Sequence, residues 1–517
     1  MDRKTGVKAV VVLLVLFVSG VSLFSDITID AIFENGHLRD YKIIQPDQVI
    51  VGPIGGDRDT WYSFKIKGVK HKTVTIIFEI KNKGELREGF GGRDAAMVTY
   101  DGKGYEIIKS IVCSLKAPGA TSGNYLRKFT HVFREDEALV SYAAPWSNTT
   151  MAELAVKLKA DKRVKISSIG NSKLKNLPLT YFKVTDSSVA DKTKKNFFLI
   201  GREDAYEVGG SWAVDGVLTF LLSEDPVAKE MLKKMVFYVF PIFSVDGVAL
   251  GSTNYPYDLN NSNYIYITAQ WEKESQYPEI QLMKDFWNKM KREGVEYDVA
   301  FKFHACCYAQ NHFRPEDCAK DNKPKERELL RLLKKKLSWR EEAGPHKDSK
   351  GYMNYHFIKV FPKAITYSSH NDFIFSGEYL RTEKNVFRRH EDVIQDGELI
   401  ARCFGEFYGI ETKEVAPYLM GGDVDRNSGK KNDPVTYYVY YYDVNEIPPA
   451  KIEVNINGKP YKMTCEKDAN YRKPVKYTFK TTLSEPVSDY CFTASNGKKE
   501  RKMPEDDYLL PGPFIIQ

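Results

Sequence analysis

The chain has 517 residues, which is longer than a chain that folds around one ordinary hydrophobic core. This length predicts two to four domains. Its hydrophobic content of 42% and aromatic content of 13% are those of a globular protein and exclude a disordered or low-complexity chain. The net charge of +7 is modest, and no Lys/Arg run is dense enough to indicate nucleic-acid binding.

The first 25 residues have the composition of a secretory signal peptide. Arg3, Lys4 and Lys8 precede an unbroken apolar run from Ala9 to Val18, and small residues follow it. The run is shorter than the roughly 20 apolar residues that a spanning helix needs. We therefore expect residues 1–25 to be cleaved, no integral membrane segment to remain, and the protein to be secreted, periplasmic or at the cell surface.

Residues 26–160 carry strand signals separated by glycine-rich turns. Trp61 to Ile66 alternates apolar and polar positions, and Thr73 to Ile80 is rich in β-branched and apolar residues. This alternation of apolar and polar residues with a period of two, together with short loops, predicts an N-terminal β-sandwich domain.

Residues 164–412 alternate strand-like and helix-like segments. This order predicts an α/β domain with a mostly parallel or mixed sheet and helices on both faces. Met235 to Phe243 is continuously apolar, as a strand covered on both faces should be. Ser223 is positioned to cap the helix that Pro226 starts.

The most informative segment lies at the start of this domain. Phe197 to Ile200 reads as a buried strand, and the loop that follows it carries Asp204 and Glu207. A helix-like segment beginning near Ser211-Trp212 comes next. Two carboxylates three residues apart, after the carboxyl end of a strand, lie where open α/β sheets place their ligand sites.

These residues resemble the M14 zinc carboxypeptidases, in particular the branch related to cytosolic carboxypeptidases. That family has a strand, a His-x-x-Glu loop and a helix opening with Ser-Trp; here Asp204 stands in place of the first histidine. The family's third zinc ligand ends a later strand, which corresponds to His304 after Val299 to Phe303. The resemblance implies one zinc ion held by Asp204, Glu207 and His304. His312 is a nearby alternative with no motif around it.

The same resemblance implies a substrate-binding role for Asn260 and Asn261. Asp258-Leu259-Asn260-Asn261 stands where the family has Asp-Leu-Asn-Arg, whose last two residues bind the terminal carboxylate of the substrate. Asparagine offers a neutral dipole where arginine offers a charged fork. The family's oxyanion-stabilising arginine is also missing from Gly251 to Tyr257, and losing one such donor typically lowers turnover by about 100-fold to 1000-fold.

The general base of the family has no counterpart at the expected place. The matching strand is Ala364 to Tyr367, and the residues after it include no Glu. Glu378 and Glu383 lie further along, and we interpret them as surface carboxylates. The sequence therefore assigns no catalytic residue.

The C-terminal part is again rich in strand signals. Residues 413–434 are predicted to be a linker, and residues 435–517 an Ig-like β-sandwich with Asn457-Gly458 and Asn496-Gly497 turns. The chain has seven cysteines, so at least one thiol is free of intramolecular pairing. Cys465 and Cys491 both lie in strand-like segments and are candidates for a disulfide.

Two functions follow from these observations. The first is an exported zinc metallocarboxypeptidase-like protein that hydrolyses peptide or amide bonds of a peptide or protein substrate, with weakened or altered activity. The second is a catalytically inactive protein of the same fold that binds peptide or cell-envelope ligands. The retained Glu207, Asn260 and His304 favour the first, and the four departures from the family pattern favour the second.

Overall fold

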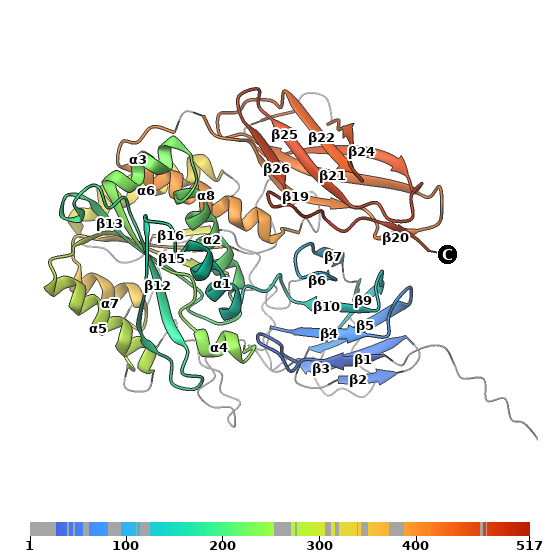
Figure 1. The fold of residues 1–517 in the computed structure, drawn as a ribbon, viewed down its shortest axis with the longest axis horizontal. Coiled ribbons are helices and arrows are strands. Elements are labelled where there is room, and N and C mark those ends of the chain that lie inside the picture. Colours follow the sequence, from blue (N-terminus) through green and yellow to red (C-terminus); the bar gives the residue numbers. More distant parts are fainter. Residues whose placement is uncertain are drawn as a thin grey trace, which may run out of the picture.

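The computed structural model describes residues 27–38, 41–44, 47–54, 61–80, 95–109, 111–113, 125–252, 270–274, 277–305, 312–315, 320–338, 340–342, 350–371, 387–412, 414–465, 469–471 and 473–516. They form an N-terminal β-rich region, a central α/β domain and a C-terminal β-rich region, and Figure 1 shows that all three lie against one another.

The N-terminal region contains two five-stranded sheets, with strand orders β1-β4-β10-β6-β7 and β2-β3-β5-β9-β8. The rings of Tyr62 and Phe78 lie 4.4 Å apart and join the two sheets. The strands agree with the sequence pattern, whereas the β-sandwich classification stays a prediction. The strands are β1 Thr28–Asp30, β2 Tyr41–Ile44, β3 Gln48–Ile54, β4 Ser63–Lys67, β5 Thr73–Ile80, β6 Ala95–Thr99, β7 Glu106–Lys109, β8 Ile111–Cys113, β9 Tyr125–Val132 and β10 Glu137–Ser141.

The central domain contains a mixed eight-stranded sheet, in the order β11-β12-β14-β13-β15-β18-β16-β17. The four strands β14, β13, β15 and β18 are parallel, so their carboxyl ends meet at one edge. The strands are β11 Val164–Asn171, β12 Pro178–Val184, β13 Lys195–Gly201, β14 Met235–Phe240, β15 Tyr297–His304, β16 His312–Pro315, β17 Glu341–Glu342 and β18 Ile365–His370.

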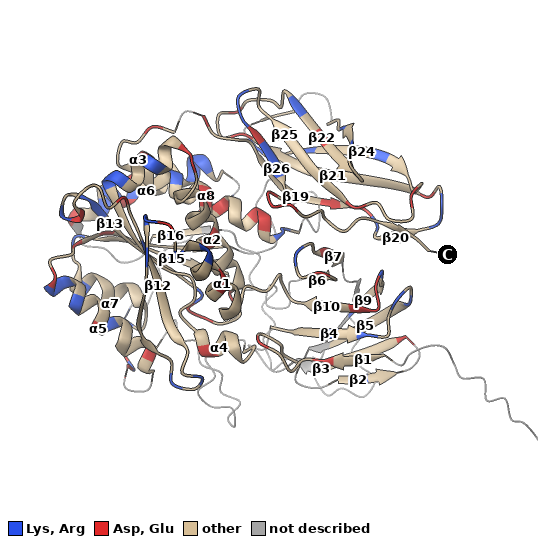
Figure 2. Cartoon of the chain, viewed as in Figure 1, with Lys and Arg blue, Asp and Glu red and all other residues tan. Residues whose placement is uncertain are grey.

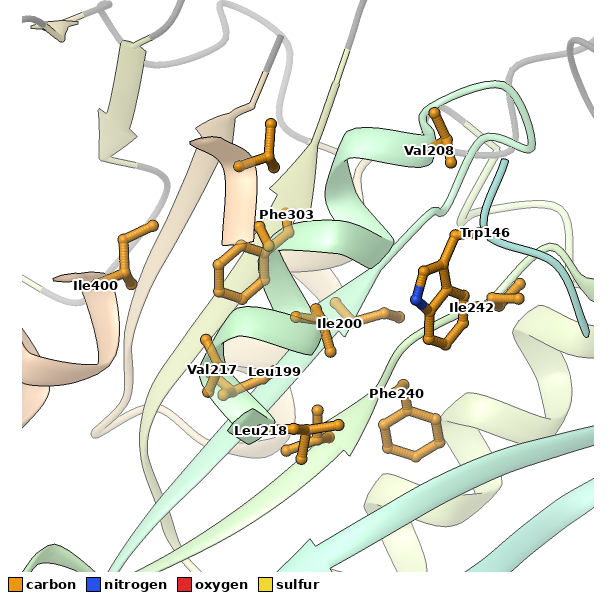
Figure 3. Close-up of a cluster of buried hydrophobic side chains, with 14 of the residues drawn as sticks. Trp146, Leu199, Ile200, Val208, Val217, Leu218, Phe240, Ile242, Phe303 and Ile400 are labelled. Carbon is orange, nitrogen blue, oxygen red and sulfur yellow. The ribbon is translucent and has the colours of Figure 1, made fainter. Parts of the chain in front are cut away.

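Helices cover both faces of this sheet, as the sequence predicts. Adjacent side chains of a strand point to opposite faces, and on β13 the ring of Phe197 packs against Phe404 while that of Phe198 packs against Trp287 and Phe357. Figure 3 shows the buried cluster that Leu199, Ile200 and their neighbours form. The helices are α1 Asn148–Leu158, α2 Val208–Leu221, α3 Pro226–Lys234, α4 Val245–Ala249, α5 Pro278–Arg292, α6 Lys323–Lys336, α7 Met353–Val360 and α8 His390–Phe407.

One detail of the helix starts differs from the sequence prediction. The cap of α3 is Asp225, whose carboxylate accepts a hydrogen bond from the backbone N–H of Val227, and not Ser223. Asp225 directly precedes Pro226, so its side chain reaches the first free N–H groups of the helix.

Helices α2 and α8 pack backbone to backbone through a reciprocal pair of glycines. A Cβ atom at Gly216 of α2 would overlap the carbonyl of Ile394, and one at Gly397 of α8 would overlap the carbonyl of Ala213. Only glycine allows two helices to approach this closely. The pair therefore fixes α8 directly against α2.

The C-terminal region contains a three-stranded sheet, β19-β21-β24, a four-stranded sheet, β23-β22-β25-β26, and the pair β20-β27. Strand β19 lies inside the predicted 413–434 linker and pairs with β21, so this part of the linker belongs to the sheet. Cys465 and Cys491 are both free thiols. The strands are β19 Tyr418–Val424, β20 Ser428–Gly429, β21 Pro434–Tyr442, β22 Lys451–Ile456, β23 Lys459–Lys462, β24 Val475–Thr482, β25 Tyr490–Ser495, β26 Glu500–Met503 and β27 Phe514–Ile515.

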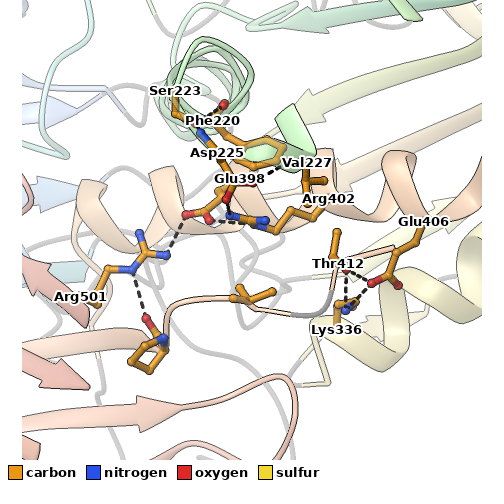
Figure 4. A network of polar contacts seen from close by, with 12 residues as sticks. Phe220, Ser223, Asp225, Val227, Lys336, Glu398, Arg402, Glu406, Thr412 and Arg501 are labelled. Atoms are coloured by element: carbon orange, nitrogen blue, oxygen red, sulfur yellow. Dashed lines mark hydrogen bonds and ion pairs between the residues drawn. The ribbon is translucent and has the colours of Figure 1, made fainter. Parts of the chain in front are cut away.

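A paired charge cluster joins the C-terminal region to helix α8. Glu398 accepts hydrogen bonds from Arg402 at 2.9 Å and from Arg501 at 2.8 Å, and Arg402 also donates to Asp225 at 2.7 Å (Figure 4). Each of these carboxylates therefore faces at least one guanidinium group. We call Asp225, Glu398, Arg402 and Arg501 the α8 charge cluster.

A second buried polar contact joins the C-terminal region to the N-terminal one. Glu106 lies 3.2 Å from Nε2 of His131, and Asn427 contacts Nδ1 of the same ring at 2.7 Å. Glu106 and His131 are 5% and 3% exposed. Burial raises the pKa of Glu106 to about 8, since the opposing effect of Arg134 is smaller.

Candidate metal centre

The loop after β13 is shaped by a buried arginine. Arg202 has a positive φ of 56°, and its Nε donates to the carbonyl of Ala205 at 2.7 Å. A second guanidinium nitrogen donates to the carbonyl of Trp146, which precedes α1. These two contacts hold residues 202–205 in a tight turn, so that the next residues return toward the end of the sheet.

The first turn of α2 lies directly on the ends of two neighbouring strands. A Cβ atom at Gly209 would overlap the carbonyl of Asn371, just after β18, and one at Gly210 would overlap the carbonyl of Phe303 on β15. Glu207 immediately precedes this helix. The two glycines therefore bring Glu207 against the carboxyl end of β15.

His304 is the last residue of β15 and meets Glu207 there. Its Nδ1 lies 2.8 Å from Oε2 of Glu207. The two residues are 7% and 2% exposed, so the contact is almost fully shielded from solvent. Two of the residues that the sequence singled out, 97 positions apart in the chain, are thus in direct contact.

The other ring nitrogen of His304 faces a residue that the sequence reasoning missed. Its Nε2 lies 3.4 Å from Oε2 of Glu203, which is also 3.3 Å from Nζ of Lys302. The second oxygen of Glu203 accepts a hydrogen bond from the Trp271 indole at 2.9 Å. Lys302 and His304 are two residues apart on one strand, so their side chains share a face of the sheet. This spacing was the signal in the sequence that could have indicated a charged group beside His304, and with it the carboxylate that pairs with Lys302.

The two sides of the imidazole therefore have different partners. Glu207 lies at Nδ1 and Glu203 lies at Nε2. A carboxylate on the second nitrogen of a metal-binding histidine commonly orients the ring and fixes its tautomer. The geometry gives Glu203 this orienting role and leaves Nδ1 as the ligand atom.

The end of β18 supports His304 from the side. His370 is the register partner of His304, and the two rings stack with centroids 5.4 Å apart. The backbone N–H of Asn371 donates to the carbonyl of His304 at 2.7 Å, and Arg340 donates to the side-chain oxygen of Asn371 at 2.7 Å. This support fixes the backbone at His304.

Among the described residues, the positive charges that act on Glu207 are outweighed by burial and by Glu203. Burial raises the pKa of Glu207 well above its ordinary value, and the carboxylate of Glu203 acts in the same direction. Lys302 and Arg202 act the other way, with smaller effects. A cation bound by Glu207 and His304 would favour the ionised form of the Glu207 carboxylate.

Of the other residues that the sequence singled out, the structure describes some and leaves others outside the described ranges. Asp204 is 2% exposed and lies in the same loop, three positions before Glu207. Asn260 and Asn261 fall outside the described residues, as do Glu378 and Glu383. His312 opens β16, but its side chain is also outside the described part.

The donor set of Glu207 and His304 fits zinc, since carboxylate oxygen and imidazole nitrogen are both common zinc ligands. Within the described ranges, no group of three or more His, Cys, Asp or Glu side chains is arranged to hold a metal ion. The structure thus brings together two of the three predicted ligands, and the complete set stays a prediction.

Comparison with known proteins identifies the central domain. Residues 151–397 match the family model for zinc carboxypeptidases, peptidase M14. Cytosolic carboxypeptidase 6 from Mus musculus is 26% identical over 242 residues, which cover 44% of this chain and 44% of the relative. Cytosolic carboxypeptidase 4 from Homo sapiens is 24% identical over 322 residues, or 54% of this chain and 28% of the relative. The matched part is therefore less than half of each relative.

Solved structures show the same fold. A metallo-carboxypeptidase from Burkholderia cenocepacia superposes with a TM-score of 0.60 at 15% identity, covering 74% of this chain and 99% of that one. A metallo-carboxypeptidase from Pseudomonas aeruginosa gives a TM-score of 0.57 at 15% identity, covering 74% and 99%. These likenesses confirm the predicted carboxypeptidase-like α/β architecture.

The comparisons contradict the predicted secreted, periplasmic or cell-surface location. The four curated relatives are all named as cytosolic carboxypeptidases. The prediction was based on the charge and hydropathy of residues 1–25, which lie outside the described residues. None of the helices described is both long enough and apolar enough to span a bilayer.

The order of motifs along the chain, the α/β architecture and the family match agree. The chain therefore contains a domain of the zinc carboxypeptidase family, peptidase M14.

Proposed function

We propose that the domain is a zinc-dependent peptidase that hydrolyses peptide or amide bonds, with one ion held by Asp204, Glu207 and His304. The observation that supports this most is the 2.8 Å contact between Glu207 and Nδ1 of His304, at the strand edge of a zinc carboxypeptidase family domain. Three protein ligands with one open position form a catalytic zinc site.

The residues around the ion have separate tasks in this proposal. Bound zinc would polarise the scissile carbonyl and activate water. Glu203 holds the His304 ring through Nε2, and Lys302 and Trp271 hold Glu203 in turn. This arrangement fixes the direction of Nδ1 before any ion arrives.

We further propose that turnover is lower than in members with the complete family pattern. Two carboxylates and one imidazole neutralise more of the ion's charge than two imidazoles and one carboxylate, so bound water is less acidic. Asn260 and Asn261 would meet the substrate's carboxyl terminus without the arginine fork, which weakens this contact. The peptide or protein substrate would be met inside the cell, in keeping with the names of the relatives.

One observation favours a second function, in which the domain binds peptides without hydrolysing them. The ammonium group of Lys302 lies 3.3 Å from Glu203, next to His304, and both residues of this ion pair are buried. A fixed positive charge beside the ligand histidine opposes a bound cation. The two functions therefore differ in whether the purified protein carries metal.

The test is metal content by mass spectrometry on the purified full-length chain and four variants. We expect about one zinc per chain, lost in His304→Ala, Glu207→Gln and Asp204→Asn, with retention in His356→Ala. His356 lies on α7, where its Nε2 contacts the carbonyl of Lys350, and provides a matched control for the loss of an imidazole.

Zinc-loaded protein would then be screened for cleavage of peptides with free and amidated C-termini. Zinc together with release of C-terminal residues supports the peptidase. Metal-free wild-type protein contradicts it, and peptide binding measured on that protein would establish the second function. Retention of zinc in Asp204→Asn removes Asp204 from the ligand set.

A further inference from the structure

A cleft of about 780 Å³ lies where the three regions of the chain meet. Its walls come from the turn before β7, from α1 and α2, from the start of α8 and from the segment after β26. Figure 1 shows these elements converging beside α1. The volume is in the range of small-molecule sites, which often form between domains.

The cleft is separate from the candidate metal centre. None of Glu203, Glu207 and His304 lines it. Its lining residue Asp215 lies eight positions after Glu207 on α2, about 12 Å along the helix axis at 1.5 Å per residue. A ligand in the cleft therefore occupies a different place from a substrate at the metal centre.

Aromatic rings form a fixed wall of the cleft. The ring of Trp212 packs on that of His390 with centroids 4.5 Å apart, and Tyr105 meets His390 edge-on at 5.5 Å. The Trp212 indole N–H donates to the carbonyl of Ala144 at 2.9 Å, which sets the orientation of its ring. Flat indole and phenol faces bind apolar groups and attract cations.

A hydrogen-bonded chain closes the wall on the C-terminal side. The hydroxyl of Tyr508 donates to Glu391 at 2.6 Å and lies 3.1 Å from Nε2 of His390. Glu391 is 6% exposed. This chain ties the segment after β26 to the start of α8 on one side of the cleft.

The charge of the lining is negative. Seven carboxyl side chains line the cleft against three lysines. Figure 2 shows the acidic positions at the start of α8 in red. The like-signed groups create a potential that attracts cations.

Asp215 is the carboxylate best placed to bind a cation. Within the described part of the chain no ion pair involves Asp215; the indole N–H of the buried Trp146 faces its carboxylate, and both this group and the charge of Lys157 favour the ionised form. The side chain is partly exposed to the cleft yet enclosed by protein, and this burial raises the pKa of Asp215 to about 6. Trp212 lies three residues earlier on α2, on the same helix face.

We propose that this cleft binds a small organic cation, an amine or amidine joined to a flat apolar group. The cationic group pairs with Asp215, and the flat group lies against Trp212. This site is independent of the proposed function, because it needs neither zinc nor the Glu207–His304 contact.

The test uses three probes of nearly equal shape and different charge: 2-phenylethylamine, 2-phenylethanol and phenylacetate. Isothermal titration calorimetry on the full chain should show the amine binding at least about tenfold more tightly than the alcohol, since a charged hydrogen bond contributes about 1.5–3 kcal/mol. Phenylacetate should bind least. Equal affinity of amine and alcohol, or no binding of the amine, overturns the proposal.

Two variants locate the site. Asp215→Asn keeps the side-chain shape and should weaken the amine at least about tenfold. Thr219→Arg places a guanidinium four residues after Asp215, at an exposed position that tolerates substitution, and should abolish binding by pairing with Asp215. Asp285→Asn, on the exposed face of α5, is the matched control and should bind like the wild type. Unchanged binding in Thr219→Arg would contradict the location, even if Asp215→Asn fails to fold.

Glu207→Gln separates this proposal from that of the metal centre. Amine binding that persists in this variant supports the cleft whether or not zinc is lost. Amine binding that disappears only in Glu207→Gln, and not in Thr219→Arg, assigns the probe to the metal centre and overturns the cleft proposal.

Discussion

Glu398 in the α8 charge cluster and Glu207 at the candidate metal centre are both carboxylates withdrawn from solvent, but their charges are balanced differently. Burial opposes ionisation of Glu398, yet the guanidinium groups of Arg501 and Arg402 outweigh it and hold its pKa below the ordinary value. At Glu207 burial prevails, and the pKa is raised well above the ordinary value. The structural cluster thus contains the cations that balance its carboxylates, whereas at Glu207 the described cations do not outweigh burial.

The largest expected effect is a loss of stability when the α8 charge cluster is broken. Arg501→Met leaves Glu398 with one of its two guanidinium partners and also removes the hydrogen bond from Nε of Arg501 to the carbonyl of Pro417. Breaking a buried pair typically costs about 3–5 kcal/mol, and thermal and denaturant unfolding would measure the loss. Lys498→Met, which removes an exposed partner of Glu414, should cost less than about 1 kcal/mol. Equal losses in the two variants would contradict the comparison.

The second expected effect is a pH dependence of stability that comes from Glu106, a buried carboxylate that no arginine side chain pairs with among the described residues. Its pKa rises from 4.5 to about 8 on folding, so its contribution to stability is full below pH 4.5 and is lost as the pH rises through 8. The stability of Glu106→Gln relative to the wild type should therefore increase with pH across this window, by at most about 1.4 kcal/mol per unit. Unfolding curves at pH 5, 6.5 and 8 measure this slope. Glu135→Gln, at an exposed carboxylate, should show no such slope.

Lys302 tests the same comparison, because its ammonium group pairs with Glu203, which contacts His304. Lys302→Met removes a fixed positive charge, and zinc affinity should rise by about tenfold, equivalent to about 1.4 kcal/mol. Competition with a chelator measures the change. Lys195→Met removes a half-exposed lysine at the start of β13 and should leave the affinity unchanged. Weaker zinc binding in Lys302→Met would show instead that Lys302 acts mainly by holding Glu203.

The smallest effect is expected for Glu207→Gln in metal-free protein. The amide is able to keep a hydrogen bond to Nδ1 of His304 while removing a charge from a buried place. The variant should be at least as stable as the wild type, with a gain on the order of 1 kcal/mol. A clear loss of stability would show that Glu207 is satisfied without a metal ion.

The sequence was sufficient to predict which parts of the site lie at or after the end of a strand. Glu207 follows the β13 strand and His304 ends β15, and parallel strands place these ends at one edge of the sheet. The α/β alternation likewise predicted helices on both faces. The helices follow from hydropathy patterns along the chain, whereas the choice of Glu207 and His304 as site residues rested on the resemblance to the M14 zinc carboxypeptidases.

Contacts that depend on backbone conformation or on distant segments could not be predicted in this way. Glu203, which contacts His304, directly follows Arg202, whose positive φ no pattern of residue types indicated. Trp271 joins Glu203 from a segment 68 residues away. Arg501 and Glu398 are 103 residues apart, and nothing in either local sequence indicates the partner.

The glycine pair between α2 and α8 has a mechanical consequence. At Gly216 and Gly397 no side chain separates the two helices, and the backbone of each lies directly on the other. Helix α8 carries Glu398, which binds the C-terminal region through Arg501, and α2 begins next to Glu207. The glycine pair therefore connects the C-terminal region, through Glu398 and Arg501, to the helix that begins next to Glu207, and a side chain introduced at Gly216 or Gly397 would have to push these two helices apart.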